Sequence, residues 1–112
     1  MAPVGAQYRQ GDVLLVAEPA LPGDAAPVAF AAEPLALVPG EAGPGSHTLA
    51  PSAVLRAYSR KGGDGSVVWI ELAGTVTLAH PEHAPVALEP GIWRVIRQRE
   101  YEPAAAPRRV AD

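Results

Sequence analysis

Proline and glycine constrain the fold of this 112-residue chain more than any other feature, since it contains thirteen prolines and eleven glycines. Proline removes a backbone N–H and clashes with the preceding helical turn, and glycine loses the most conformational entropy on folding. The segments between these residues are short and apolar, which is typical of strands separated by turns. The sequence predicts an all-β fold, a small antiparallel β-barrel or β-sandwich of about six to eight short strands. The alternative is an α+β fold with one short helix within residues 28–37.

The β-branched and alternating segments predict where the strands lie. Residues 61–65 (KGGDG) predict a hairpin turn, because its glycines can adopt positive φ. In residues 75–79 the apolar Val76 and Leu78 alternate with polar residues, so these two side chains are expected to face the core. Strands are expected at residues 13–16, in two pieces of 28–38 separated by Pro34, and at 53–60, 66–72, 75–79, 86–88 and 92–101.

Length limits the domain organisation, because a chain of this size supports one hydrophobic core. We expect residues 1–10 to form a flexible N-terminal lead, residues 11–102 to form a single β domain, and residues 103–112 to form a C-terminal tail.

Composition excludes several classes of function. The chain has no cysteine, which excludes disulfides, thiolate metal sites and cysteine nucleophiles. The formal net charge of −3 gives no basic surface for nucleic acid. The N-terminus lacks the basic and apolar parts of a signal peptide, and no apolar run approaches about 20 residues. A soluble cytoplasmic protein without a membrane partner is expected.

The three histidines, His47, His80 and His83, all fall in predicted loops. Neutral imidazole is the commonest metal ligand where thiolates are absent, so these residues are the candidate ligands of a divalent metal ion. Glu41, Glu82 or Glu89 would add an oxygen ligand. The structural alternative is that these loop histidines are solvated or cap turns through one ring nitrogen.

A second candidate site lies near the C-terminus, where Arg97, Arg99 and Tyr101 share one face of the expected last strand. They are the candidate ligand-binding residues, as a platform for a carboxylate or phosphate. The structural alternative is a strand that leaves the core, with its arginines paired to acids of the N-terminal half. No serine lies in a strand-to-helix elbow and no glycine-rich segment has the lysine of a phosphate loop, so no catalytic residue is predicted.

Three segments resemble a group of short, uncharacterised bacterial and phage-associated proteins: residues 11–14 (GDVL), the loop at 40–49, and residues 83–101, which end in QREY. The loop of that group reads G-H-x-H, whereas this chain has Gly45 in place of the first histidine. The resemblance implies no activity, and Gly45 implies weaker binding or no binding at that loop.

The leading hypothesis for function is a small β-module for binding or assembly, acting as a homo-oligomer or with a protein partner. Broken, alanine-rich strands leave sheet edges that proteins usually cover. One alternative is a cupin-like metal-dependent enzyme that uses the three histidines with Glu41 or Glu82 as a fourth ligand or general base. It is opposed by the single histidine at position 47, where cupins have a pair. A second alternative is a structural component of a phage particle.

Overall fold

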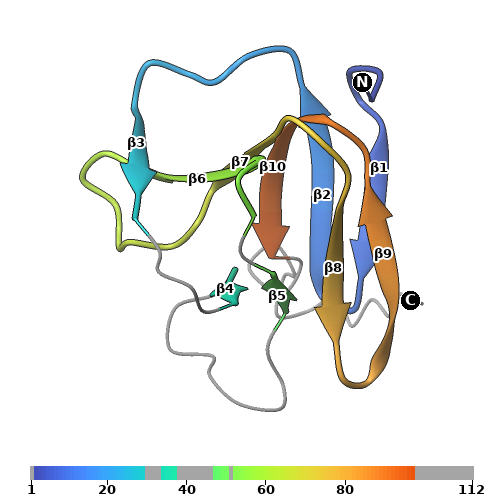
Figure 1. Cartoon of the computed structure of the whole chain (residues 1–112). Coiled ribbons are helices and arrows are strands. Elements are labelled where there is room, and N and C mark those ends of the chain that lie inside the picture. The colour runs from blue at the N-terminus through green and yellow to red at the C-terminus, as the bar shows by residue number, and fades with distance from the viewer. Residues whose placement is uncertain (1, 30–33, 38–46, 51, 98–112) are drawn as a thin grey trace, which may run out of the picture.

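The computed structural model describes residues 2–29, 34–37, 47–50 and 52–97. Its described residues form ten strands and no helix, and every strand pairing is antiparallel. The strands make two sheets that pack as a sandwich (Figure 1). No helix in this part of the chain has the length and apolar character to cross a membrane.

The larger sheet has six strands, and its centre is the long pairing of the last described strand with the second. Its order across the sheet is β1 (Gln7–Gln10), β2 (Val13–Glu18), β10 (Gly91–Arg97), β7 (Trp69–Leu72), β6 (Leu55–Arg60) and β3 (Ala25–Val28).

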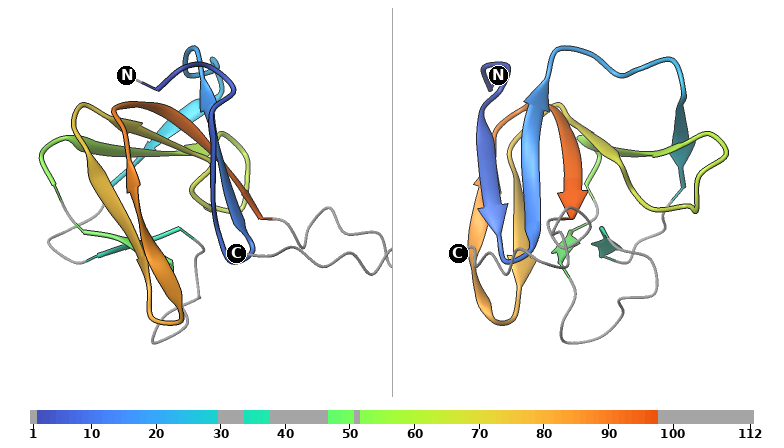
Figure 2. Two further views of the ribbon diagram at one scale, coloured as in Figure 1. Left: turned by 90° about the vertical axis from the view of Figure 1, so that its right-hand side faces the viewer. Right: turned by 180° about the vertical axis from the view of Figure 1, so that it is seen from behind.

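The smaller sheet has four strands and lies against the β1–β2 end of the larger one (Figure 2). The side chain of Gln10 on β1 donates hydrogen bonds to the main-chain oxygens of Leu78 and Ala84, which lie on the two longer strands of the smaller sheet. The strand order of the smaller sheet is β4 (Leu35–Ala36), β5 (Thr48–Leu49), β8 (Val76–His80) and β9 (His83–Leu88).

The core fills the space between the sheets because each strand turns alternate side chains inward. In β2, Val13, Leu15 and Ala17 are buried while their neighbours are half-buried. In β8, Val76 and Leu78 are buried as the alternation predicted. The largest fully buried apolar side chains are Trp93, Leu15, Leu37, Leu49, Ile70, Leu78 and Leu88.

The all-β sandwich is confirmed, and the barrel is not, because the two sheets do not close into one. The hairpin at residues 61–65 is also confirmed, since β6 and β7 pair on either side of it. No helix lies in the described residues of 28–37, where β3 ends at Val28 and β4 spans Leu35–Ala36.

The structure describes the N-terminal end of the expected domain but not its C-terminal end. Residues 7–10 were expected in a flexible lead, but they form β1 and pair with β2 from Gln7↔Val16 to Gln10↔Val13. The sequence QYRQ has no apolar alternation, so its partner strand, and not its own pattern, makes it a strand. The expected tail at 103–112 and the end of the last expected strand, at 98–101, lie outside the described residues.

Candidate functional site

The three histidines stand side by side across the inner face of the smaller sheet. The pairing of Thr48 with Ala79 places His47 opposite His80, and β8 pairs His80 directly with His83. The ring centroids of His47 and His80 are 4.4 Å apart, those of His80 and His83 are 4.5 Å apart, and those of His47 and His83 are 6.2 Å apart. We call His47, His80 and His83 the histidine row.

A two-residue turn fixes the second half of this row. Pro81 and Glu82 connect β8 to β9, so His80 and His83 are cross-strand neighbours. The backbone N–H of Glu82 donates to Nδ1 of His80 over 3.0 Å. An imidazole nitrogen that accepts a hydrogen bond carries no proton, so the proton of His80 is on Nε2.

The β1–β2 hairpin of the larger sheet covers the row. Its turn residues are Gly11 and Asp12, and Gly11 has a φ of 59°. A Cβ atom at Gly11 would lie 2.7 Å from Nε2 of His83 and 3.3 Å from Cε1 of His47. Glycine is therefore required here both for the backbone conformation and for the close approach of the two sheets.

Gln10 sets the orientation of His47. Its side chain is 1% exposed, and its Nε2 donates to the main-chain oxygens of Leu78, at 3.0 Å, and Ala84, at 2.9 Å. Because both amide hydrogens are used, Oε1 must be the atom that faces Nδ1 of His47, at 2.9 Å. The Nδ1 atom of His47 is therefore a donor.

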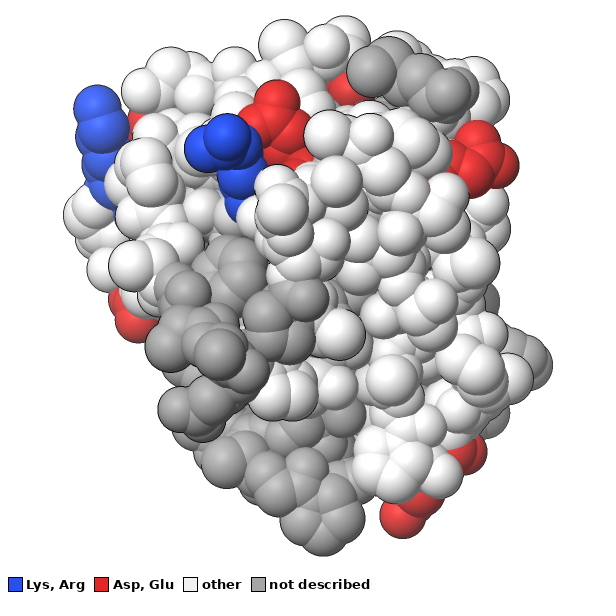
Figure 3. Space-filling model, in the orientation of Figure 1, with Lys and Arg blue, Asp and Glu red and all other residues white. Residues whose placement is uncertain are grey.

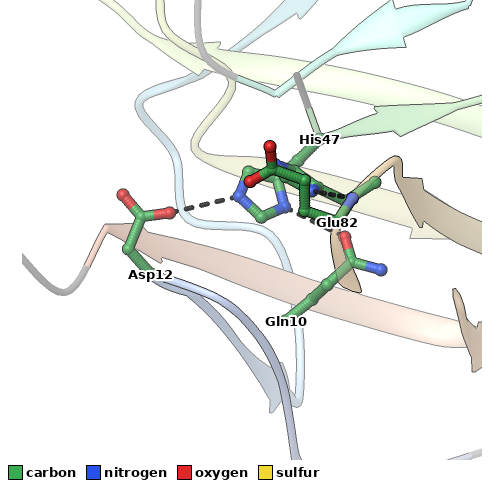
Figure 4. Close-up of polar contacts among 5 residues, drawn as sticks. Gln10, Asp12, His47 and Glu82 are labelled. Carbon is green, nitrogen blue, oxygen red and sulfur yellow. Dashed lines mark hydrogen bonds and ion pairs between the residues drawn. The ribbon is translucent and has the colours of Figure 1, made fainter. Parts of the chain in front are cut away.

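Asp12 occupies the other side of the same imidazole. His47 is 2% exposed, and its Nε2 lies 3.1 Å from Oδ1 of Asp12 (Figure 4). A neutral His47 with its proton on Nδ1 would turn the Nε2 lone pair toward a carboxylate, which is repulsive. The 3.1 Å contact is instead a hydrogen bond, in which a proton lies between Nε2 and Oδ1. The Asp12 side chain is 37% exposed, so this position is reached from solvent.

The structure describes two of the three predicted oxygen ligands, Glu82 and Glu89, and Glu89 accepts a hydrogen bond from the hydroxyl of Tyr8. Glu82 lies in the turn of the row and contacts His80 through its backbone. Glu41 lies outside the described residues. Among these residues, no group of three or more His, Asp or Glu side chains is arranged to hold a metal ion. The structure brings the three histidines together, and their role as metal ligands stays a prediction.

The C-terminal candidate site is described only in part. Arg97 ends β10 and is paired with Val13 of β2, while Arg99 and Tyr101 lie outside the described residues. Their role in ligand binding stays a prediction. One expected arginine pairing is present, because Nε of Arg94 lies 2.8 Å from Oε2 of Glu18.

Two shallow hollows on the outer face of the larger sheet offer another place for a ligand. They have volumes of about 350 Å³ and 300 Å³ and share Arg56, and neither is lined by a member of the histidine row. In Figure 3 the surface over β8 and β9 carries few charged side chains, in keeping with the exposed residues Thr77, Ala79, Ala84 and Ala87. The polar groups that converge are those of the histidine row.

Sequence reasoning found the histidines but missed Gln10 and Asp12. Gln10 was placed in the expected N-terminal lead, and a buried glutamine has no sequence pattern of its own. The available signal was the Gly11-Asp12 pair, which is typical of a two-residue hairpin turn and would have made residues 7–10 a strand.

Comparison with known proteins gives a match to one family model over residues 9–98, from within β1 to one residue past β10. The family is described as "Domain of unknown function (DUF8820)". No curated protein and no solved structure matches the chain.

Proposed function

The chain belongs to this family of unknown function, and we propose that it is a ligand-binding module whose site is the histidine row with Gln10 and Asp12. The observation that carries the proposal is the double contact of the buried His47, whose two ring nitrogens face Gln10 and Asp12. Both sheets contribute side chains to this one arrangement.

The free-energy cost of burying the polar side chains of Gln10 and His47 supports a role for them beyond packing. Polar groups in a core must be desolvated, and apolar residues of similar volume often give equal or greater stability. Apolar residues occupy the next inward-facing positions on β5 and β8, where Leu49 and Leu78 are fully buried. A chain that needed only a closed sandwich could continue these apolar positions to the end of the sheet.

Binding is favoured over assembly by the surface of the described part of the chain. Val4 is its one exposed large hydrophobic side chain. Obligate subunit interfaces are more apolar than this. The homo-oligomer or protein partner expected from sequence stays a prediction, and the cupin-like alternative lacks the closed barrel on which that likeness depends.

The test is a nuclear magnetic resonance titration of the untagged protein, following the imidazole resonances of all three histidines. We expect saturable shifts with at least one member of a panel of zinc, nickel, phosphate and small carboxylates. Backbone resonances of Arg56 and Tyr58, at the outer hollows, serve as the control and should not move. If no panel member shifts the histidines at millimolar concentration, or if only the outer face responds, the proposal is wrong.

A further inference from the structure

We propose that His47 is a charged imidazolium ion in the folded protein, and that its ion pair with Asp12 is a pH-dependent latch between the two sheets. The latch is closed while His47 keeps both ring protons, and it opens when the ring loses one of them as the pH rises. The inference goes beyond the proposed function, because the latch depends on no ligand.

The first step is the number of protons on the His47 ring. Gln10 uses both amide hydrogens on main-chain oxygens of the smaller sheet, so its Oε1 accepts a hydrogen bond from Nδ1 of His47. On the other side of the ring, Nε2 makes its 3.1 Å hydrogen bond to Oδ1 of Asp12 (Figure 4). A carboxylate only accepts, so Nε2 donates. A ring that donates from both nitrogens is an imidazolium ion, which has no lone pair for a metal ion.

The second step is the balance of this charge. Imidazole binds a proton more tightly than a carboxylate does, so the shared proton belongs to His47 and the negative charge to Asp12. His47 is 2% exposed, and a buried charge is tolerated where it is both paired and hydrogen-bonded. Asp12 supplies the opposite charge, and Gln10 and Asp12 together accept from both N–H groups.

The other two members of the histidine row face His47 from β8 and β9. The His80 ring lies 4.4 Å from that of His47, and its Nδ1 carries no proton because it accepts the backbone N–H of Glu82. The His83 ring is stacked on His47, with 6.2 Å between centroids and 7° between planes. A charge on His83 would repel the charge on His47 at this distance. One charged ring, His47, agrees with the stacking.

The acidic and basic groups nearby come from the turns and from β10. Glu82, in the β8–β9 turn, is exposed and contacts the row through its backbone N–H. Arg97 ends β10 opposite Val13, the residue that follows Asp12. The carboxylate that pairs with His47 is that of Asp12.

The third step is the place of the ion pair in the fold. Asp12 lies in the β1–β2 turn of the larger sheet, and His47 directly precedes β5 of the smaller one. The turn lies so close to the row that a Cβ atom on Gly11 would be 3.3 Å from Cε1 of His47. If Nε2 loses its proton, its lone pair faces the carboxylate, and the turn is repelled from the row.

The direction of the pH dependence follows from this pairing. The folded protein stabilises the protonated form of His47 through Asp12. The stabilising contribution is therefore fully present below about pH 6.5, the ordinary value for histidine, and is lost as the pH rises and the folded protein gives up this proton. The latch is closed in acid and open in alkali.

The experiment follows the ring nitrogens of the three histidines by nuclear magnetic resonance, in the full chain without a histidine tag or added ligand. At about pH 7.5 an ordinary histidine is about nine-tenths neutral. We expect both nitrogens of His47 to give the signals of protonated nitrogens at this pH. The backbone amide signals of Gly11 and Asp12 should change over the same pH range as the His47 ring. Asp12→Asn removes the charge and keeps the shape, and should lower the ratio of charged to neutral His47 at least about tenfold.

Glu82→Gln is the matched control, because it removes an exposed carboxylate near the same row and should change that ratio by less than about twofold. Circular dichroism confirms that each variant is folded, and the titration of the unchanged chain tests the charge of His47 without any substitution. The inference is overturned if Nε2 of His47 carries no proton at about pH 7.5. It is also overturned if Asp12→Asn leaves the titration of His47 unaltered, or if the Gly11 and Asp12 signals do not follow the ring. Because no ligand is added, such a result leaves the proposed function standing. A ligand panel that fails while His47 titrates as expected removes the proposed function and leaves the latch.

Discussion

The Tyr58 hydroxyl shows how burial and one contact on the outer face change the acidity of a side chain. It donates to Oε1 of Glu71 over 3.1 Å. Burial first, and then the hydrogen bond and negative charge of Glu71, raise the pKa of Tyr58. The neutral phenol is favoured in the folded protein, so its contribution to stability is fully present below about pH 10 and is lost as the pH rises through the raised pKa.

Ultraviolet titration of the folded protein checks this. We expect Tyr58 to ionise above pH 10, and Glu71→Gln to lower its pKa without restoring the usual value, because burial remains. Tyr58→Phe identifies its part of the titration curve. Tyr8, whose pKa is raised by burial and by Glu89, is an internal control that Glu71→Gln should leave unchanged. An unaltered Tyr58 curve in that variant would show that Glu71 has no influence.

At the scale of single residues, candidate functional residues can be chosen from the sequence more readily than their contacts can. The three histidines could be chosen as candidates because imidazole chemistry belongs to the residue itself. That His47 would face Gln10 and Asp12 depends on a contact between two sheets, across 37 and 35 positions of the chain. Such a contact leaves no periodic pattern in the sequence.

The β8–β9 hairpin contains an irregularity that explains the burial of Gln10. Its register shifts between Leu78 and His80, and Pro85 on the opposite strand has no N–H to donate. Gln10 supplies hydrogen bonds to the main-chain oxygens of Leu78 and Ala84 in this region. A side chain of β1 thus completes the hydrogen bonding of the other sheet.

Gln10→Leu should therefore destabilise the protein by about 1–3 kcal/mol, since it leaves buried carbonyl groups and Nδ1 of His47 without this partner. Urea denaturation measures the free energy of unfolding, and hydrogen exchange should quicken in β9 before the rest of the sheet. Gln7→Leu, on the same strand but at an exposed position, is the control and should change stability by less than about 0.5 kcal/mol. Equal effects of the two substitutions would mean that the hydrogen bonds of Gln10 to the smaller sheet do not stabilise the protein.

Strands with an apolar alternation were predictable, and those without one were not. The alternation of Val76 and Leu78 predicts β8, and the glycines of residues 61–65 predict the hairpin of β6 and β7. The polar β1 and the two-residue β4 and β5 are too short or too polar to be recognised, because neighbouring strands determine them.

The whole molecule depends on one core shared by both sheets. Trp93 and Leu15 of the larger sheet are as fully buried as Leu78 and Leu88 of the smaller one. Because neither sheet has a second apolar layer of its own among the described residues, the two should unfold in a single transition.

Leu78→Ala should lower the free energy of unfolding by about 2–5 kcal/mol. Tryptophan fluorescence reports on the larger sheet, where both tryptophans lie, and circular dichroism reports on both sheets. The two signals should shift together in urea. Val4→Ala, at a residue that is 67% exposed, should have almost no effect. A fluorescence transition that is unmoved by Leu78→Ala would mean that the sheets unfold independently.

The two-residue turn between His80 and His83 also limits how the gene can change in length. The buried Leu78 and Leu88 hold each histidine on the inner face of its own strand, but one extra codon would replace the two-residue turn that pairs His80 directly with His83. A substitution of Pro81 or Glu82 would leave both rings on the inner face. In this hairpin, a change in turn length would therefore disturb the pairing of the two histidines more than an exchange of the turn residues themselves.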